Sequence, residues 1–126
     1  MYTNNPYAAY KKNSIETLSQ EQLLLMLVDG AVKYTKIARL ALLEKNMPRV
    51  HKELVRVQDI FLELMITLDK SDNKAMDDLY NIYEFIKNEL ARANMKKDIE
   101  IIDEILPVIE EIRDMWHEVD KKNKGL

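Results

Sequence analysis

The chain offers few side chains for metal binding or nucleophilic catalysis, since its 126 residues include two histidines and no cysteine. A carboxylate-bridged di-iron bundle needs two Glu-x-x-His motifs on different helices. The sequence supplies only Asp114-Met-Trp-His117, and the residues around His51 match no such motif. Histidines that stand alone in this way are usually ordinary surface or boundary residues. We therefore expect no metal site and no cofactor.

A histidine phosphotransfer domain is the enzyme-class alternative, because it needs only one exposed histidine on a four-helix domain. His51 lies in the first turn of its expected helix and not in the middle, which disfavours this alternative. The sequence shows no Ser–His–Asp arrangement and no glycine-rich phosphate loop. The acidic pairs Asp77-Asp78 and Glu110-Glu111 are typical of solvated helix faces. The residues thus predict a protein that is not an enzyme.

Composition limits the fold and the partners. Charged residues make up 33% of the chain, above the average of about a quarter, which predicts long helices with solvated outer faces. Two glycines and three prolines are too few for the turns of an all-β fold. The net charge of −3 argues against nucleic-acid binding, and no apolar run approaches the ~18 residues of a membrane span. With no signal-peptide pattern and no cysteine, we expect a cytoplasmic protein.

Apolar periodicity predicts four helices, at about 19–45, 48–69, 74–93 and 97–121, between an N-terminal arm (1–18) and a frayed tail (122–126). Ser19 and Gln22 form a capping-box pattern at the start of the first helix. Asn46 is the expected N-cap of the second helix, and Pro107 predicts a kink in the fourth. Helices of this length joined by short connections pack side by side. The predicted fold is therefore all-α, an antiparallel four-helix up-down-up-down bundle with an N-terminal arm.

Each expected helix carries an apolar stripe that predicts the core of the bundle. The stripe of the first helix includes Leu23, Leu24 and Leu27, and that of the fourth ends at Trp116. The third helix has a narrower stripe that includes Ile82, and we expect this helix to be purely structural.

Apolar residues beside these stripes exceed what a minimal bundle interior requires. They are Leu25, Val32, Val55, Leu62, Ile66, Ile101, Val108 and Met115. They could simply widen the core, or they could form a groove for an amphipathic helix or an extended peptide from another chain. A third interpretation is a bundle that self-associates through these residues, as a homodimer for instance, without a dedicated client. The arm carries Tyr2, Tyr7 and Tyr10, which could cover such a groove.

The chain resembles the FliS family of flagellar export chaperones over nearly its whole length. The resemblance depends on the order and spacing of several segments: Asn5-Pro-Tyr-Ala-Ala-Tyr-Lys-Lys-Asn-Ser-Ile-Glu-Thr-Leu18, Gln22-Leu-Leu-Leu-Met-Leu27, Asp29-Gly-Ala31, Gln58-Asp-Ile60, Glu63-Leu-Met65, Leu79-Tyr80 with Tyr83, Ala93-Asn94, Lys97-Asp-Ile99 and Arg113-Asp-Met-Trp116. No single segment is specific, but their combination is.

The resemblance implies a cytosolic helical bundle that binds the disordered C-terminal segment of flagellin. Binding would prevent premature self-assembly and aggregation before type III flagellar export. The resemblance also implies that the N-terminal arm caps part of the apolar site and is displaced by flagellin, with Tyr7 and Tyr10 as the capping residues. Delivery of flagellin to the export gate is a further implied role.

Overall fold

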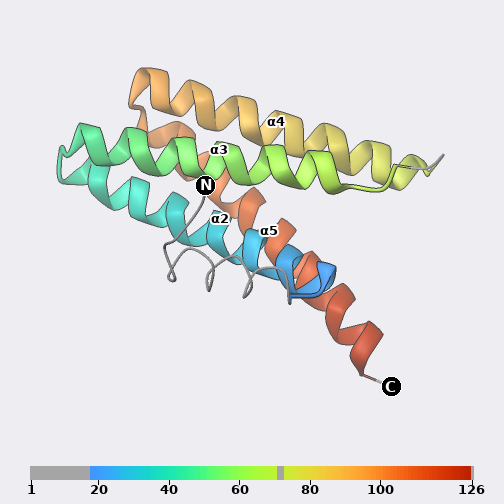
Figure 1. The fold of residues 1–126 in the computed structure, drawn as a ribbon. Helices are drawn as coiled ribbons and strands as arrows, with labels where there is room; N and C mark the ends of the chain where they lie inside the picture. The colour runs from blue at the N-terminus through green and yellow to red at the C-terminus, as the bar shows by residue number, and fades with distance from the viewer. Residues whose placement is uncertain (1–17, 71–72, 126) are drawn as a thin grey trace, which may run out of the picture.

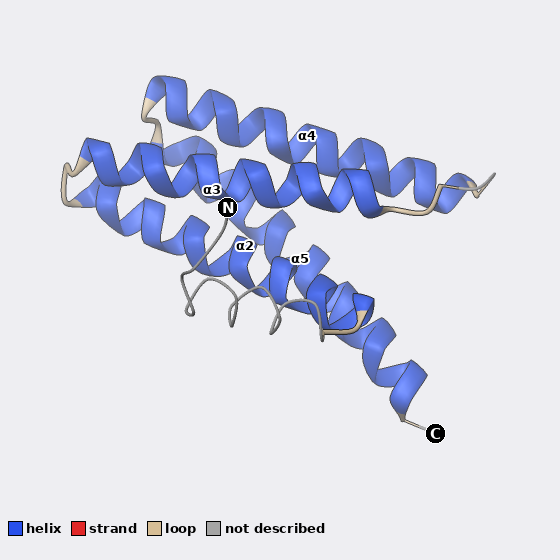
Figure 2. Ribbon diagram, in the orientation of Figure 1, coloured by secondary structure: helices blue, strands red, loops and turns tan. Residues whose placement is uncertain are grey.

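The computed structural model describes residues 18–70 and 73–125, and this part of the chain contains helices and no strand. The helices are α2 (Gln20–Leu43), α3 (Met47–Thr67), α4 (Lys74–Lys96) and α5 (Ile99–Lys124), shown in Figure 1 and Figure 2. The all-α prediction is confirmed. The predicted capping residues Tyr7 and Tyr10 lie outside the described residues.

The helices begin directly after polar residues whose side chains cap the first turn. The Ser19 hydroxyl accepts from the Gln22 N–H at 3.1 Å, and the Gln22 side chain accepts from the Ser19 N–H at 2.9 Å, so the capping box is confirmed. Asn46 caps α3 as predicted, with its side chain accepting from the Arg49 N–H. Asp98 is the N-cap of α5, with its side chain accepting from the Glu100 N–H at 2.9 Å. Local capping chemistry therefore sets these boundaries.

The α4–α5 corner lies further along the chain than the predicted helix end at about residue 93. The helix runs to Lys96, and Lys97 then adopts a left-handed conformation with φ of 51°. The Lys97 ammonium donates to both the backbone and side-chain oxygens of Asn94, at 2.6 and 2.8 Å. These bonds satisfy acceptors at the helix end, and they let a non-glycine residue make the turn.

The helices form a ring in which α2 packs on α3, α3 on α4, α4 on α5 and α5 on α2. The pairing of α4 with α5 is the least extensive of the four. Figure 1 shows α3 and α4 running together, whereas the C-terminal half of α5 diverges from α4 toward one end of the bundle. The bundle is therefore closed at the end that holds the α2–α3 and α4–α5 corners, and open at the other.

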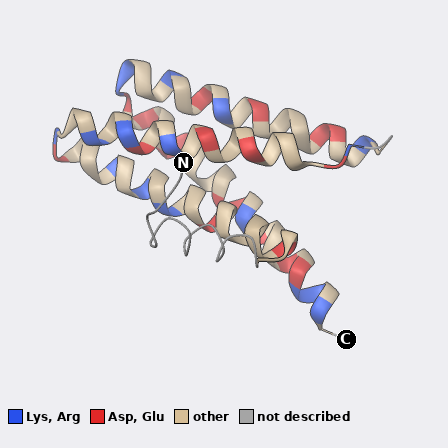
Figure 3. Cartoon of the chain, viewed as in Figure 1, with Lys and Arg blue, Asp and Glu red and all other residues tan. Residues whose placement is uncertain are grey.

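The core is a continuous cluster of buried apolar residues from all four helices. Its largest members include Phe61 and Leu64 of α3, Tyr83 of α4 and Ile109 of α5. At the α2–α5 seam, the Arg39 guanidinium donates to the Asp103 carboxylate at 2.5 Å and holds the pKa of that carboxyl below its usual range. Basic and acidic residues are interspersed along the four helices (Figure 3).

Among the described residues, Thr35 and Glu53 are the buried polar ones. The Thr35 hydroxyl donates to the Ala31 carbonyl, and the Glu53 carboxylate pairs with Arg49 and Arg56.

We expect Pro107→Ala to raise the free energy of unfolding by about 1–3 kcal/mol. Pro107 lies inside α5, which continues through it, and is exposed. Alanine would restore a backbone donor for the Asp103 carbonyl without disturbing a packed surface. Urea unfolding measures the change, with Pro48→Ala as the control. Pro48 occupies the first turn of α3, where no donor is lost, so this control should change stability by less than about 0.5 kcal/mol. Equal effects of the two substitutions would contradict the prediction.

Candidate functional site

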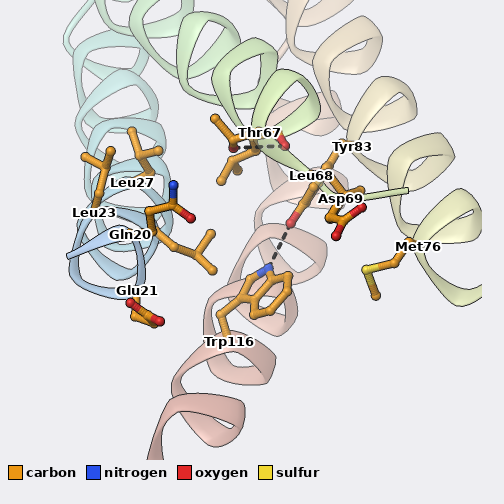
Figure 4. A pocket seen from close by; sticks show the side chains of 12 residues that line it. Gln20, Glu21, Leu23, Leu27, Thr67, Leu68, Asp69, Met76, Tyr83 and Trp116 are labelled. Carbon is orange, nitrogen blue, oxygen red and sulfur yellow. Dashed lines mark hydrogen bonds between the residues drawn. The ribbon is translucent and has the colours of Figure 1, made fainter. Parts of the chain in front are cut away.

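The open end of the bundle encloses a hollow of about 450 Å³, to which all four helices contribute. Its lining residues are Gln20, Glu21, Leu23, Leu24, Leu27, Leu64, Thr67, Leu68, Asp69, Met76, Tyr83 and Trp116. Figure 4 shows the side chains from α2 on one side of the hollow, Met76 of α4 on the other, and Trp116 of α5 beneath. Most of these side chains are apolar, and polar groups stand at the margin.

The hollow arises because the apolar stripes continue after the helices begin to separate. Leu23, Leu24 and Leu27 share one side of the first turns of α2, and each is only half-buried. Leu68 follows the last turn of α3 and is also half-buried. Apolar surface that no other helix covers is typical of a binding site.

Trp116 and Tyr83 link α5 to α4 across the floor of the hollow. The Trp116 indole N–H donates to the Tyr83 hydroxyl oxygen at 2.8 Å (Figure 4). The Tyr83 ring packs edge-on against Phe61, with 5.9 Å between centroids. Burial raises the pKa of Tyr83 to about 12. Tyr83 is thus held neutral and fixed, while half-buried Trp116 keeps one face toward the hollow.

The raised pKa of Tyr83 predicts a loss of stability in alkali. Below pH 10 the neutral phenol stabilises the fold, and this contribution disappears as the pH rises from about 10 to 12, because the unfolded chain ionises first. The free energy of unfolding should fall by on the order of 2–3 kcal/mol over this range of two pH units. Urea unfolding at pH 9 to 12 should show this loss in wild type and a smaller loss in Tyr83→Phe. Parallel curves for the two proteins would contradict it.

The structure places the eight predicted groove residues in three environments. Val32 and Ile101 are in the core, at 4% and 3% exposure. Half-buried positions are held by Leu25, Val55 and Val108, and exposed ones by Leu62, Ile66 and Met115. Placing Val32 and Ile101 on an exposed groove was wrong, because the neighbouring helices pack over both. Binding by the other six stays a prediction.

These six residues do not share one groove. At 100° per residue, Leu25 lies on the side of α2 that carries Lys36, which pairs with Glu110 of α5. Leu62 lies on the side of α3 that carries His51, which contacts Asn94 of α4, and Ile66 lies on the adjacent outer side. Val108 and Met115 lie on the side of α5 that borders α4, opposite to Glu110. These three sets belong to three different seams, and Val55, the sixth residue, lies near Leu27 and Ile60 on the surface between α2 and α3. An apolar stripe within one helix does not show which seam a residue will border.

The hollow was missed in the sequence because its leucines were assigned to the core stripe. Their spacing is the same as that of core residues, and only the divergence of the helices exposes them. The signal available was their position at a helix start, where Leu23–Val28 is an unbroken apolar run. Ile82, also predicted to be core, is 41% exposed.

Both histidines make ordinary contacts between helices. A His51 ring nitrogen lies 2.9 Å from the Asn94 amide, and one of His117 lies 2.7 Å from the Asp29 carboxylate. Among residues 18–70 and 73–125, no three potential metal ligands of the His, Cys, Asp or Glu type cluster together. Within the same residues, no helix combines the length and apolar character of a membrane span.

Comparison with known families bears on the apolar hollow. The family model described as flagellar protein FliS matches residues 3–123. The chain belongs to the FliS family. A FliS relative from Bacillus subtilis (strain 168), named flagellar secretion chaperone FliS, is 31% identical over 92% of this chain and 86% of its own length. The FliS proteins of Vibrio cholerae and Escherichia coli K12 carry the same name. They are 28% and 27% identical, each over 94% of this chain and over 90% and 91% of their own lengths.

Proposed function

We propose that this FliS protein is a flagellar export chaperone that binds the disordered C-terminal segment of flagellin. Binding hides apolar side chains of that segment and prevents premature self-assembly and aggregation before type III export. Membership of a family whose curated relatives are named flagellar secretion chaperones supports the export role. The observation that carries the binding role is the apolar hollow at the open end of the bundle.

The hollow suits the apolar face of a client helix. Its volume lies within the range of about 300–1,000 Å³ that is common for ligand sites. Leu23, Leu27 and Leu68 provide walls of aliphatic side chains, and Trp116 provides a flat aromatic floor. A client helix would insert side chains at i, i+3 or i+4 spacing, as helix-in-groove partners do.

Release does not require an energy source in the chaperone. Ordering a disordered segment costs about 2–5 kcal/mol of the gross interaction energy. The complex is therefore weaker than an interface of the same area between two ordered partners. Competition at the export gate, to which we propose that the chaperone delivers flagellin, can then displace the client. Half-buried Val55 and exposed Leu62 and Ile66 of α3 are candidate contacts for a client that extends beyond the hollow.

We further propose that the N-terminal arm competes with flagellin through Tyr7 and Tyr10. Deleting residues 1–15 is then expected to strengthen peptide binding or raise its association rate, because no intramolecular competitor must leave first. Surface plasmon resonance measures the rates, and sedimentation measures self-association, which should increase as the apolar site is uncovered. Tyr7→Ser/Tyr10→Ser should reproduce the effect, whereas Tyr2→Ser should not. Unchanged binding rates and an unchanged oligomeric state would contradict the proposal that the arm competes with flagellin.

Calorimetric titration of the full chain with a flagellin C-terminal peptide tests the proposed function. We expect one saturable site and a negative heat-capacity change from apolar burial. Sedimentation of the free protein tests the rival function, a bundle that only self-associates. A dimer that does not bind the peptide would favour that rival function.

A further inference from the structure

The seam between α4 and α5 exposes large apolar side chains from both helices. On α4, Ile82 and Phe85 are exposed, and on α5 so are Met115 and Val119. Val108, half-buried, continues the α5 strip toward the corner. None of these five residues lines the hollow. The seam is therefore a second apolar surface that the helices of the described residues leave uncovered.

Helical spacing places the two strips opposite each other. Ile82, Phe85 and Glu89 lie three and four residues apart on one side of α4, and Val108, Met115 and Val119 lie seven and four apart on one side of α5. The two sides face each other, because the opposite side of α4 meets α3 through the Asn94–His51 contact, and the opposite side of α5 meets α2 through the Lys36–Glu110 ion pair. The two helices meet closely near their corner and then diverge (Figure 1). The apolar strips thus form the walls of an opening groove.

The outer edge of the groove on α5 is acidic. Glu104, Glu111 and Glu118 recur every seven residues beside the Val108–Met115 strip, and all three are exposed. Within residues 18–70 and 73–125, neither Glu111 nor Glu118 forms an ion pair. The α4 edge carries both signs of charge, since Lys74 pairs with Asp78 and Arg92 pairs with Glu89. The groove is therefore apolar inside and negative along one edge.

We propose that the α4–α5 seam is a second docking groove, and that its occupant is an amphipathic helix with lysine or arginine along one border of its apolar stripe. A helix fits because the strip from Val108 to Val119 extends for about 16 Å, or three helical turns. The basic border would lie against the glutamates of α5. A second copy of this chain is disfavoured, because the apolar strip that its own α5 would offer is bordered by glutamate and not by lysine or arginine.

Two designed peptides test the groove on the full chain. Both are 18-residue helices with the same leucine stripe, one bordered by lysine and one by glutamate. Fluorescence anisotropy should show binding of the lysine peptide that weakens as salt increases, and at least tenfold weaker binding of the glutamate peptide. Phe85→Ser/Met115→Ser should reduce binding of the lysine peptide at least tenfold, since it removes one apolar wall residue from each helix.

Charge reversal separates the groove from general attraction to an acidic protein. Glu111→Lys/Glu118→Lys should invert the preference between the two peptides. Glu44→Lys/Glu84→Lys is the matched control, with the same change in net charge at exposed sites outside the seam, and should leave the preference unchanged. Equal effects of the two reversals would overturn the proposal.

Three further outcomes would also overturn it. Loss of lysine-peptide binding in the hollow variant Leu23→Asp would place the peptide in the hollow. Loss of flagellin-peptide binding in Phe85→Ser/Met115→Ser would make the seam part of the client site. A wild-type dimer that this double variant dissociates would make a second copy the occupant. Retained flagellin binding in the double variant is the expected result, so the two sites can fail independently.

Discussion

Leu23→Asp is expected to weaken binding of a flagellin C-terminal peptide by at least 100-fold while the chain stays helical and monodisperse. Leu23 lines the hollow and is half-buried, and it is not among the side chains packed on the core cluster. A bound client would enclose the new carboxylate among leucines without a partner, which costs more than the ~2.7 kcal/mol of a 100-fold change. In the free protein, a negative charge in the first turns of α2 is favourable to the helix dipole.

Met26→Asp is the matched control for this prediction. Met26 lies three residues further along the same helix, is 55% exposed and does not line the hollow. The Met26→Asp variant should bind the peptide with an affinity within about twofold of that of the wild type. Calorimetry measures both affinities, and circular dichroism verifies the fold. If both variants bind as wild type does, the hollow is not the client site.

Phe61→Ala is expected to lower the free energy of unfolding by about 3–5 kcal/mol. Phe61 is 0% exposed and lies at the centre of the core, where its ring contacts Tyr83. Truncation removes apolar burial, leaves a cavity and deprives Tyr83 of its aromatic neighbour. A loss of this size is a large part of the ~5–15 kcal/mol that stabilises a typical domain. Urea unfolding monitored by circular dichroism measures it.

The second phenylalanine provides the comparison. Phe85 is 56% exposed on α4, so Phe85→Ala should change stability by less than about 0.5 kcal/mol. The two substitutions remove the same atoms from the same residue type, and only burial differs. Similar losses for the two variants would mean that the α4–α5 seam is packed and not open.

Much of the fold could be predicted from the sequence, because local chemistry and the apolar period act within single helices. Ser19 and Asn46 cap helices as expected, since an N-cap is satisfied by residues three positions away. The apolar stripe from Val50 to Met65 on α3 is buried, since six apolar residues at that spacing leave one face to pack. These predictions require no knowledge of the neighbouring helix.

The site could be predicted only in part, because it depends on where helices separate. Leu27 at the open end and Leu54 in the core have the same type and the same position in a stripe, yet Leu27 is half-buried and Leu54 is fully buried. Ile82 follows the period of α4 but falls on the edge that α5 leaves uncovered. Val32 was the opposite case, since α3 and α5 pack on two sides of α2 and bury it. Crossing geometry decides each of these outcomes.

The most direct measurement of the central claim is the emission of Trp116 during titration with a tryptophan-free flagellin C-terminal peptide. Trp116 is the single tryptophan of the chain and lies in the hollow. We expect a saturable blue shift at one peptide per chain, because the client excludes water from the indole, and we expect Leu23→Asp to abolish that shift. Calorimetric binding with an unchanged Trp116 spectrum would contradict the claim that flagellin occupies the hollow.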